Sequence, residues 1–239
     1  MRVKIPVLLF LLAAALPAQL AVSVRAGLIQ HIQGRAYVED RPVQTRSLHF
    51  QHLEQGKCLR TERGRAEIVL APGRVLRLDR QSAFEIISDD ITDVKIALLR
   101  GSAFIDWNER FTDGTITVQA GDASVRITER GLYRISREES ALPELRVYTG
   151  KAVVLAGENE RTVKSGRMFD LASAEASSQK FDRGQLDYFD RWNNRRSLIV
   201  DRMTAPPGAK RVRRRLGPRL GADRSDPDLG GFGGFGPRR

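Results

Sequence analysis

The sequence predicts an all-β fold: short antiparallel strands, stacked as a sandwich or a β-solenoid-like sheet, with one amphipathic helix and a disordered tail after them. Two observations support this. Apolar and polar residues alternate in many short segments between residues 27 and 174, and glycine-containing turns separate these segments. The three- and four-residue apolar spacing of a helix is missing there and occurs only after residue 180.

Composition is ordinary for a folded protein. The 239 residues are 41% hydrophobic and 29% charged, which excludes wholesale disorder. The single cysteine, Cys58, excludes a disulfide framework and a cysteine-based zinc or iron–sulfur site within the chain. Cys58 lies in a predicted strand, where we expect a buried small apolar side chain; an unpaired thiol is the alternative.

The first 23 residues are typical of a Sec-type signal peptide. Arg2 and Lys4 precede an apolar run over residues 5–16, and small residues allow cleavage after Ser23 or after Ala18. We therefore expect a periplasmic or secreted protein. An uncleaved inner-membrane anchor is the alternative, because residues 5–24 are long enough to span a bilayer.

Residues 24–180 form the predicted β domain. Ala66, Ile68 and Leu70 alternate with other residues, the Pro72-Gly73 turn follows, and an apolar strand pattern resumes at Val75. One face of each strand is apolar, while the other is rich in Arg, Glu and Thr. We expect that polar face to be solvated, with opposite charges pairing between neighbouring strands.

The predicted helix covers residues 181–203. One of its faces can carry four apolar side chains, namely Leu186, Phe189, Trp192 and Ile199. Acidic residues lie early in the segment and arginines late, as the helix dipole favours. The helix either packs on the β domain or docks a partner, and in the second case Phe189 and Trp192 are the candidate docking residues.

Residues 204–239 form the predicted disordered tail, rich in Arg, Gly and Pro. Its basic cluster consists of Lys210, Arg211, Arg213, Arg214 and Arg215. Behind a signal peptide, this cluster is a candidate docking site for an anionic envelope polymer or lipid headgroups; a solubilising segment without a partner is the alternative.

The net charge of +11 does not indicate a nucleic-acid binder. Residues 1–23 carry +2 and residues 201–239 carry +6, which leaves +3 for residues 24–200. The folded part is close to neutral, and an exported protein does not meet the chromosome. We expect no nucleic-acid partner, and membrane contact only through the N-terminal segment or the basic tail.

The order of short motifs resembles the FecR-like domain, an exported all-β domain of bacterial cell-envelope signalling proteins. The segment 56–61, GKCLRT, resembles the family's G-x-x-L-x-T step, and 98–103 resembles its L-x-x-G hairpin. The segment 131–135 is similar to its G-T-x-F-x-V step, with Leu132 in place of threonine, and 147–153 to its closing V-x-x-G-x-V. The resemblance covers about residues 27–200.

The resemblance implies a stand-alone exported member. Only four residues precede the apolar run, which leaves no room for the cytoplasmic anti-sigma segment of the family's iron-uptake regulators. The expected function is non-enzymatic binding, scaffolding or sensing in the cell envelope, with an envelope protein or anionic polymer as partner. The alternatives are a membrane-anchored signalling regulator and a glycan-acting envelope hydrolase.

No catalytic, cofactor or metal site is predicted. His49 and His52 lack further zinc ligands, and the carboxylates of Asp89, Asp90 and Asp93 lack the spacing of a calcium loop. A nucleophile elbow and a phosphate-binding glycine loop are missing from the sequence. We therefore expect these histidines and aspartates to be ordinary surface residues.

Overall fold

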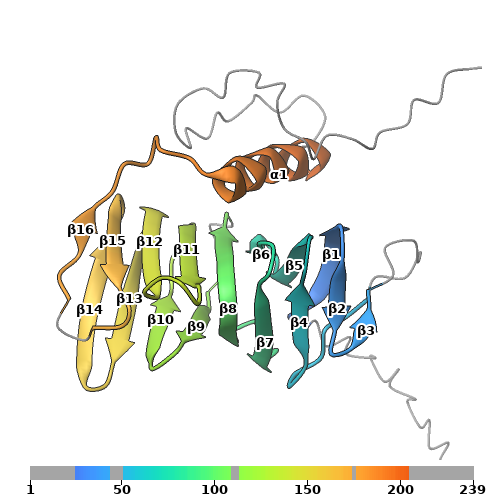
Figure 1. Cartoon of the computed structure of the whole chain (residues 1–239), viewed down its shortest axis with the longest axis horizontal. Coiled ribbons are helices and arrows are strands. Elements are labelled where there is room, and N and C mark those ends of the chain that lie inside the picture. Colours follow the sequence, from blue (N-terminus) through green and yellow to red (C-terminus); the bar gives the residue numbers. More distant parts are fainter. Residues whose placement is uncertain (1–24, 44–50, 109–112, 174–175, 205–239) are drawn as a thin grey trace, which may run out of the picture.

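The computed structural model describes residues 25–43, 51–108, 113–173 and 176–204. These residues form sixteen β-strands and one helix, α1, near the C-terminal end (Figure 1). The predicted fold class is confirmed. The predicted signal peptide and residues 205–239 of the predicted tail lie outside the described residues.

Two sheets share one long strand, β8 (Asp93–Trp107). The first half of β8 pairs with β7 (Ala83–Ser88) and, in parallel, with β9 (Thr115–Ala120). Its second half pairs with β6 (Arg74–Leu78) and β11 (Gly131–Arg137), both antiparallel. We call the sheet of β6 and β11 the helix-side sheet and the other the far sheet.

The remaining strands extend both sheets. The helix-side sheet also contains β1 (Leu28–Gln33), β5 (Arg65–Ala71), β12 (Glu144–Thr149), β15 (Arg167–Asp170) and β16 (Gln179–Lys180). The far sheet also contains β2 (Ala36–Val38), β3 (Arg41–Pro42), β4 (Cys58–Thr61), β10 (Ala123–Ile127), β13 (Lys151–Ala156) and β14 (Asn159–Lys164). The chain moves between the sheets every few strands and advances in one direction (Figure 1), so the fold has features of both a sandwich and a solenoid.

One apolar core lies between the sheets. The alternation predicted for Ala66, Ile68 and Leu70 is confirmed, because all three side chains are fully buried in this core. The far sheet contributes residues such as Phe84 and Val118. Cys58 lies on a strand as predicted, but it is only half-buried, so the expectation of full burial is wrong.

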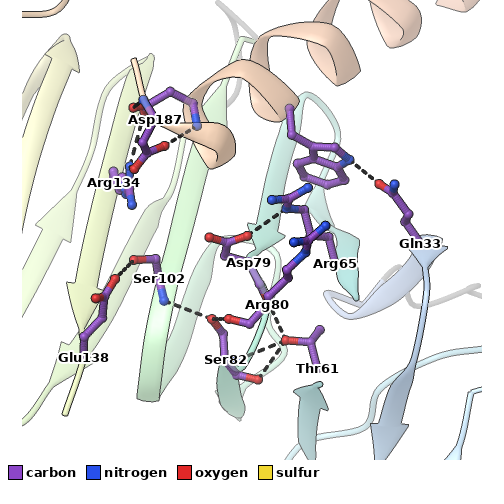
Figure 2. A network of polar contacts seen from close by, with 12 residues as sticks. Gln33, Thr61, Arg65, Asp79, Arg80, Ser82, Ser102, Arg134, Glu138 and Asp187 are labelled. Atoms are coloured by element: carbon purple, nitrogen blue, oxygen red, sulfur yellow. Dashed lines mark hydrogen bonds and ion pairs between the residues drawn. The ribbon is translucent and has the colours of Figure 1, made fainter. Parts of the chain in front are cut away.

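Gly101 lies between the two halves of β8, where the strand passes from one sheet to the other. Its φ of 81° favours glycine, and an added Cβ would meet the side chain of Ser82 and lie 2.6 Å from the Ser82 Cα. The Ser82 hydroxyl accepts a hydrogen bond from the Ser102 N–H at 3.0 Å (Figure 2), which fixes this close approach. The transition between sheets therefore requires a residue without a side chain.

We expect Gly101→Ala to destabilise the fold by about 1–2 kcal/mol more than Gly56→Ala, measured by chemical denaturation. Gly56 has nearly the same φ, 75°, but no atom lies within 4 Å of its added Cβ. The loss of stability in Gly56→Ala therefore measures the cost of the backbone conformation alone. Equal losses of unfolding free energy in the two variants would show that the contact with Ser82 does not contribute to the cost of Gly101→Ala.

The helix α1 spans Tyr188–Thr204 and begins seven residues later than predicted. Asp187 and Asp190 form a reciprocal cap: the Asp187 carboxylate accepts from the Asp190 N–H at 2.8 Å, and the Asp190 carboxylate accepts from the Asp187 N–H at 2.9 Å. This cap fixes the helix start. Within the described part of the chain, no helix is long and apolar enough to span a membrane.

Candidate functional site

The candidate site is the interface between α1 and the outer face of the helix-side sheet. Phe189 and Trp192 lie on the inner face of α1 and are buried. They pack with Phe104 of β8, Leu132 of β11 and Tyr148 of β12, and we call these five residues the aromatic cluster. The Phe104 and Phe189 ring centroids are 4.9 Å apart. This cluster gives α1 an apolar seat on the sheet.

Polar contacts fix the orientation of the Trp192 indole. Its Nε1 donates to Oε1 of Gln33 at 2.6 Å, and the Arg65 guanidinium lies 5.5 Å from the ring centroid. The Asp79 carboxylate accepts from Nε of Arg65 at 2.7 Å (Figure 2). The tryptophan is therefore held by groups from β1, β5 and the turn after β6.

A buried charge cluster lies beside the aromatic cluster. On the sheet it consists of Arg77 of β6, Glu67 of β5 and Asp106 of β8, all almost fully buried. Nε of Arg77 lies 2.7 Å from Glu67, and its Nη1 lies 2.9 Å from Asp106. Buried charges need partners with good geometry, because their desolvation is expensive. Arg77 therefore contacts both buried carboxylates of the sheet.

The helix completes this cluster with three polar side chains. Arg196 donates to Glu67 at 2.7 Å, Asn193 accepts from Arg77 at 2.7 Å, and the Ser197 hydroxyl accepts from Arg77 and donates to Asp106, both at 3.0 Å. Two arginines thus balance two carboxylates across the interface. The inner face of α1 is apolar in its first turns and polar in its later ones, so it specifies one position on the sheet.

The sequence-based expectation of a solvated polar strand face is wrong beneath α1. Glu67 and Arg77 lie opposite one another on neighbouring strands, as predicted, but the helix covers the pair. The prediction of which residues form the buried face of the helix was also only partly correct. Ile199 is 41% exposed, and Asn193 and Ser197 take the buried positions instead. The pattern of apolar residues alone could not identify a helix face that buries polar groups.

Glu67 ionises more readily than an ordinary glutamate. Burial alone would raise its pKa, but the hydrogen bonds from Arg196 and Arg77 and their charges outweigh burial and lower the pKa below 4.5. Ionised Glu67 therefore stabilises the folded state above pH 4.5, and this stabilisation is lost as the pH falls through the lower folded-state pKa.

We expect Glu67→Gln to flatten the loss of stability below pH 4.5, because the variant has no proton to take up at this site. Urea denaturation from pH 7 to about pH 3 measures this dependence. Glu160→Gln is the control, because Glu160 makes an exposed ion pair. An unchanged acid dependence in Glu67→Gln would contradict the assignment of Glu67 to the buried cluster.

A third set of contacts holds the N-terminal end of α1. Arg134 of β11 lies 2.6 Å from Asp187 and 3.4 Å from Asp190, and the Tyr148 hydroxyl donates to Asp190 at 2.6 Å. Figure 2 shows Arg134 reaching Asp187 from the sheet. Burial raises the pKa of Asp190. At Asp187 burial also acts to raise the pKa, but the charge of Arg134 and the hydrogen bonds from Arg134 and Asp190 together outweigh it and lower the pKa. The helix cap is therefore bonded to the sheet as well as to the helix.

The predicted docking residues fall into two groups. Phe189 and Trp192 belong to the aromatic cluster, which matches the packed alternative for the helix; docking a partner through these rings would require α1 to leave the sheet. Lys210, Arg211, Arg213, Arg214 and Arg215 lie outside the described residues. The structure therefore joins the first group to the β domain and leaves the role of the second a prediction.

The aspartates considered as calcium ligands make other contacts. Asp89 pairs with Arg25 at 3.1 Å, Asp90 accepts from the N–H and hydroxyl of Thr92, and Asp93 pairs with Lys95. His49 lies outside the described residues. Among the residues that the structure describes, no group of three or more His, Cys, Asp or Glu side chains could hold a metal ion.

Sequence reasoning missed the polar residues of the interface between α1 and the sheet: Glu67, Arg77, Asp106, Arg134, Asn193, Arg196 and Ser197. One signal could have identified part of the set. Asn193 is four residues after Phe189, and Ser197 is four residues after Asn193, so the two polar residues continue the helical face of Phe189. When polar residues continue the helical face that the apolar residues begin, the surface that this face contacts is expected to carry polar or charged groups.

Fold and interface together define an all-β domain with a terminal helix seated on one sheet. Residues 58–153 match the family model described as FecR protein. This match confirms the predicted resemblance to the FecR-like domain family over a stretch that runs from β4 into β13. It supports a role in envelope signalling or sensing.

Two matching crystal structures are both described as a "putative anti-sigma factor" from Parabacteroides distasonis ATCC 8503. Each is 16% identical to this chain, with a TM-score of 0.43, and the match covers 52% of this chain and 58% of the other. The chain thus spans little more than half the length of these structures. No curated protein matches it.

Proposed function

We propose that this protein is an exported, non-enzymatic FecR-like domain that binds, scaffolds or senses in the bacterial cell envelope. The observation that carries the proposal is the FecR match over residues 58–153. The signal-peptide pattern of residues 1–23 supports export. The buried ionisable groups described above bond one another or the helix, which suits a structural role better than a reactive one.

An exposed sheet edge supports the binding role. In the described residues, β14 ends the far sheet and pairs only with β13. All its residues except Val163 are exposed, and its charged side chains protect the edge from self-association while leaving its backbone available to a specific partner. We propose an envelope protein as the partner on this edge, with the basic tail contacting anionic polymer.

Export is tested by identifying the mature N-terminus of the protein isolated from its host. We expect mass spectrometry of the envelope and periplasmic fractions to find a chain that begins at Val24 or at Gln19. An intact N-terminus held in the membrane would favour the anchored regulator instead. A full-length chain confined to the cytoplasm would overturn the proposal.

The binding role is tested by crosslinking in cells. A photoreactive residue at Thr162 of β14 should crosslink to a defined envelope protein, whereas the same residue at Leu142, an exposed position in the connection between β11 and β12, is the matched control. Equal crosslinking at both positions would contradict specific binding at the edge. Turnover of a wall glycan that is lost on one carboxylate substitution would favour the hydrolase.

A further inference from the structure

The outer face of α1 carries apolar side chains that the fold does not use. Tyr188 is 64% exposed, Leu198 is 51% exposed and Ile199 is 41% exposed. The inner face already fills its contacts with the sheet, so these three side chains add nothing to the interface described above. In Figure 1, α1 lies at the outside of the molecule, above the ends of the strands. A single convex helix therefore presents this surface.

Arginines lie between these apolar residues. Arg191 and Arg195 follow Tyr188 at helical spacings of three and seven residues, which places them on the same face. The Arg191 guanidinium lies 4.7 Å from the Tyr188 ring centroid, so charge and ring occur together at the surface. The outer face thus combines exposed apolar groups with positive charge.

The described carboxylates of α1 and its cap, Asp187 and Asp190, are bonded to side chains of the sheet. Asp190 is 2% exposed and bonds Tyr148 and Arg134, and Asp187 bonds Arg134. Residues 201–239 of the sequence carry a net charge of +6. The outer face of α1 is therefore complementary to a layer whose exterior is negatively charged and whose interior is apolar.

We propose that the outer face of α1, formed by Tyr188, Arg191, Arg195, Leu198 and Ile199, binds the anionic headgroup layer of a membrane. Arginines pair with lipid phosphates, while tyrosine, leucine and isoleucine enter the boundary between headgroups and acyl chains. Nucleic acid or a soluble anionic polymer would use the arginines but would not bury Leu198 and Ile199. This membrane contact lies within the folded domain, apart from the N-terminal segment and the tail.

The test compares binding of the full chain to vesicles of phosphatidylglycerol and phosphatidylcholine with binding to phosphatidylcholine alone. The apolar N-terminal segment can act on both vesicles, so the difference between them reports the charge-dependent contact. We expect Arg191→Gln/Arg195→Gln to weaken binding to the anionic vesicles about 25-fold, or about fivefold for each arginine removed. Arg41→Gln/Arg63→Gln, at two exposed positions outside α1, is the matched control and should bind as the wild type does.

Insertion is tested with Leu198→Trp in the same full chain. We expect brominated phosphatidylglycerol to quench the new tryptophan strongly, and to quench Leu142→Trp, at the 65% exposed Leu142, only weakly. Near-UV circular dichroism verifies that each variant is folded. Should the double arginine variant fail to fold, the Leu198→Trp measurement still decides the proposal.

Two results would overturn the proposal. Wild-type binding by a folded Arg191→Gln/Arg195→Gln variant would show that other basic residues hold the membrane. Equal quenching of Leu198→Trp and Leu142→Trp would show that the outer face does not enter the lipid, whatever the charge dependence, and would favour a soluble anionic polymer. The proposal is supported if binding to the vesicles depends on Arg191 and Arg195 and if the tryptophan of Leu198→Trp is quenched more strongly than that of Leu142→Trp.

Discussion

Arg77→Leu is expected to lower the free energy of unfolding by about 3–5 kcal/mol. Arg77 is 1% exposed, and its Nη1 lies 2.9 Å from the buried Asp106 carboxylate. Its removal takes one ion-pair partner from each of two buried carboxylates, Glu67 and Asp106. The cause of the expected loss is buried negative charge that is left with fewer partners. Urea denaturation at pH 7 measures it.

Arg126→Leu is the control for this prediction. Arg126 of β10 likewise forms an ion pair, with Glu160, but both side chains are exposed, so the expected loss is below about 1 kcal/mol. Similar losses in Arg77→Leu and Arg126→Leu would show that the charge cluster contributes no more than a surface ion pair. The conclusion that the buried charge cluster holds α1 on the sheet would then be wrong.

Trp192→Ala is expected to destabilise the protein by about 3–5 kcal/mol. The change removes the buried indole, its stacking on Phe189 and its hydrogen bond to Gln33. It also leaves a cavity between α1 and the sheet, because the surrounding strands are fixed by their own hydrogen bonds. Thermal and chemical denaturation, followed by far-UV circular dichroism, measure the loss.

Tyr188→Ala provides the comparison, since it removes a ring from the same helix at a 64% exposed position and should change stability by less than about 0.5 kcal/mol. If Trp192→Ala left the melting temperature unchanged, the helix would be independent of the β domain. The docking alternative for Phe189 and Trp192 would then be favoured.

The parts of the fold that could be predicted depend on local patterns. Alternation over Ala66, Ile68 and Leu70 reports which side of a strand is buried, and that depends on nearest neighbours along the chain. The resemblance to the FecR-like family rested likewise on short motifs in order, and it was confirmed over residues 58–153. Local signals were therefore sufficient for the class and the family resemblance.

The interface could not be predicted, because its contacts join residues far apart in the chain. Glu67 and Arg196 are 129 positions apart, and Arg77 and Ser197 are 120 apart. A charged residue on a strand is the same in sequence whether water or a helix covers it. The helix start was misplaced for a related reason. The apolar pattern already begins at Phe181, whereas the Asp187 and Asp190 cap, which Arg134 of the sheet holds, starts the helix at Tyr188.

The central claim is that α1 and the two sheets fold as one unit, with the inner face of the helix seated and the outer face available to the envelope. Amide hydrogen exchange on the full chain tests it most directly, because exchange reports the opening of each element separately. We predict that the amides of residues 192–199 are protected to a similar extent as those of β8 and β11, and that Arg77→Leu increases their exchange. Rapid exchange throughout α1, beside fully protected strands in the wild-type chain, would contradict the account.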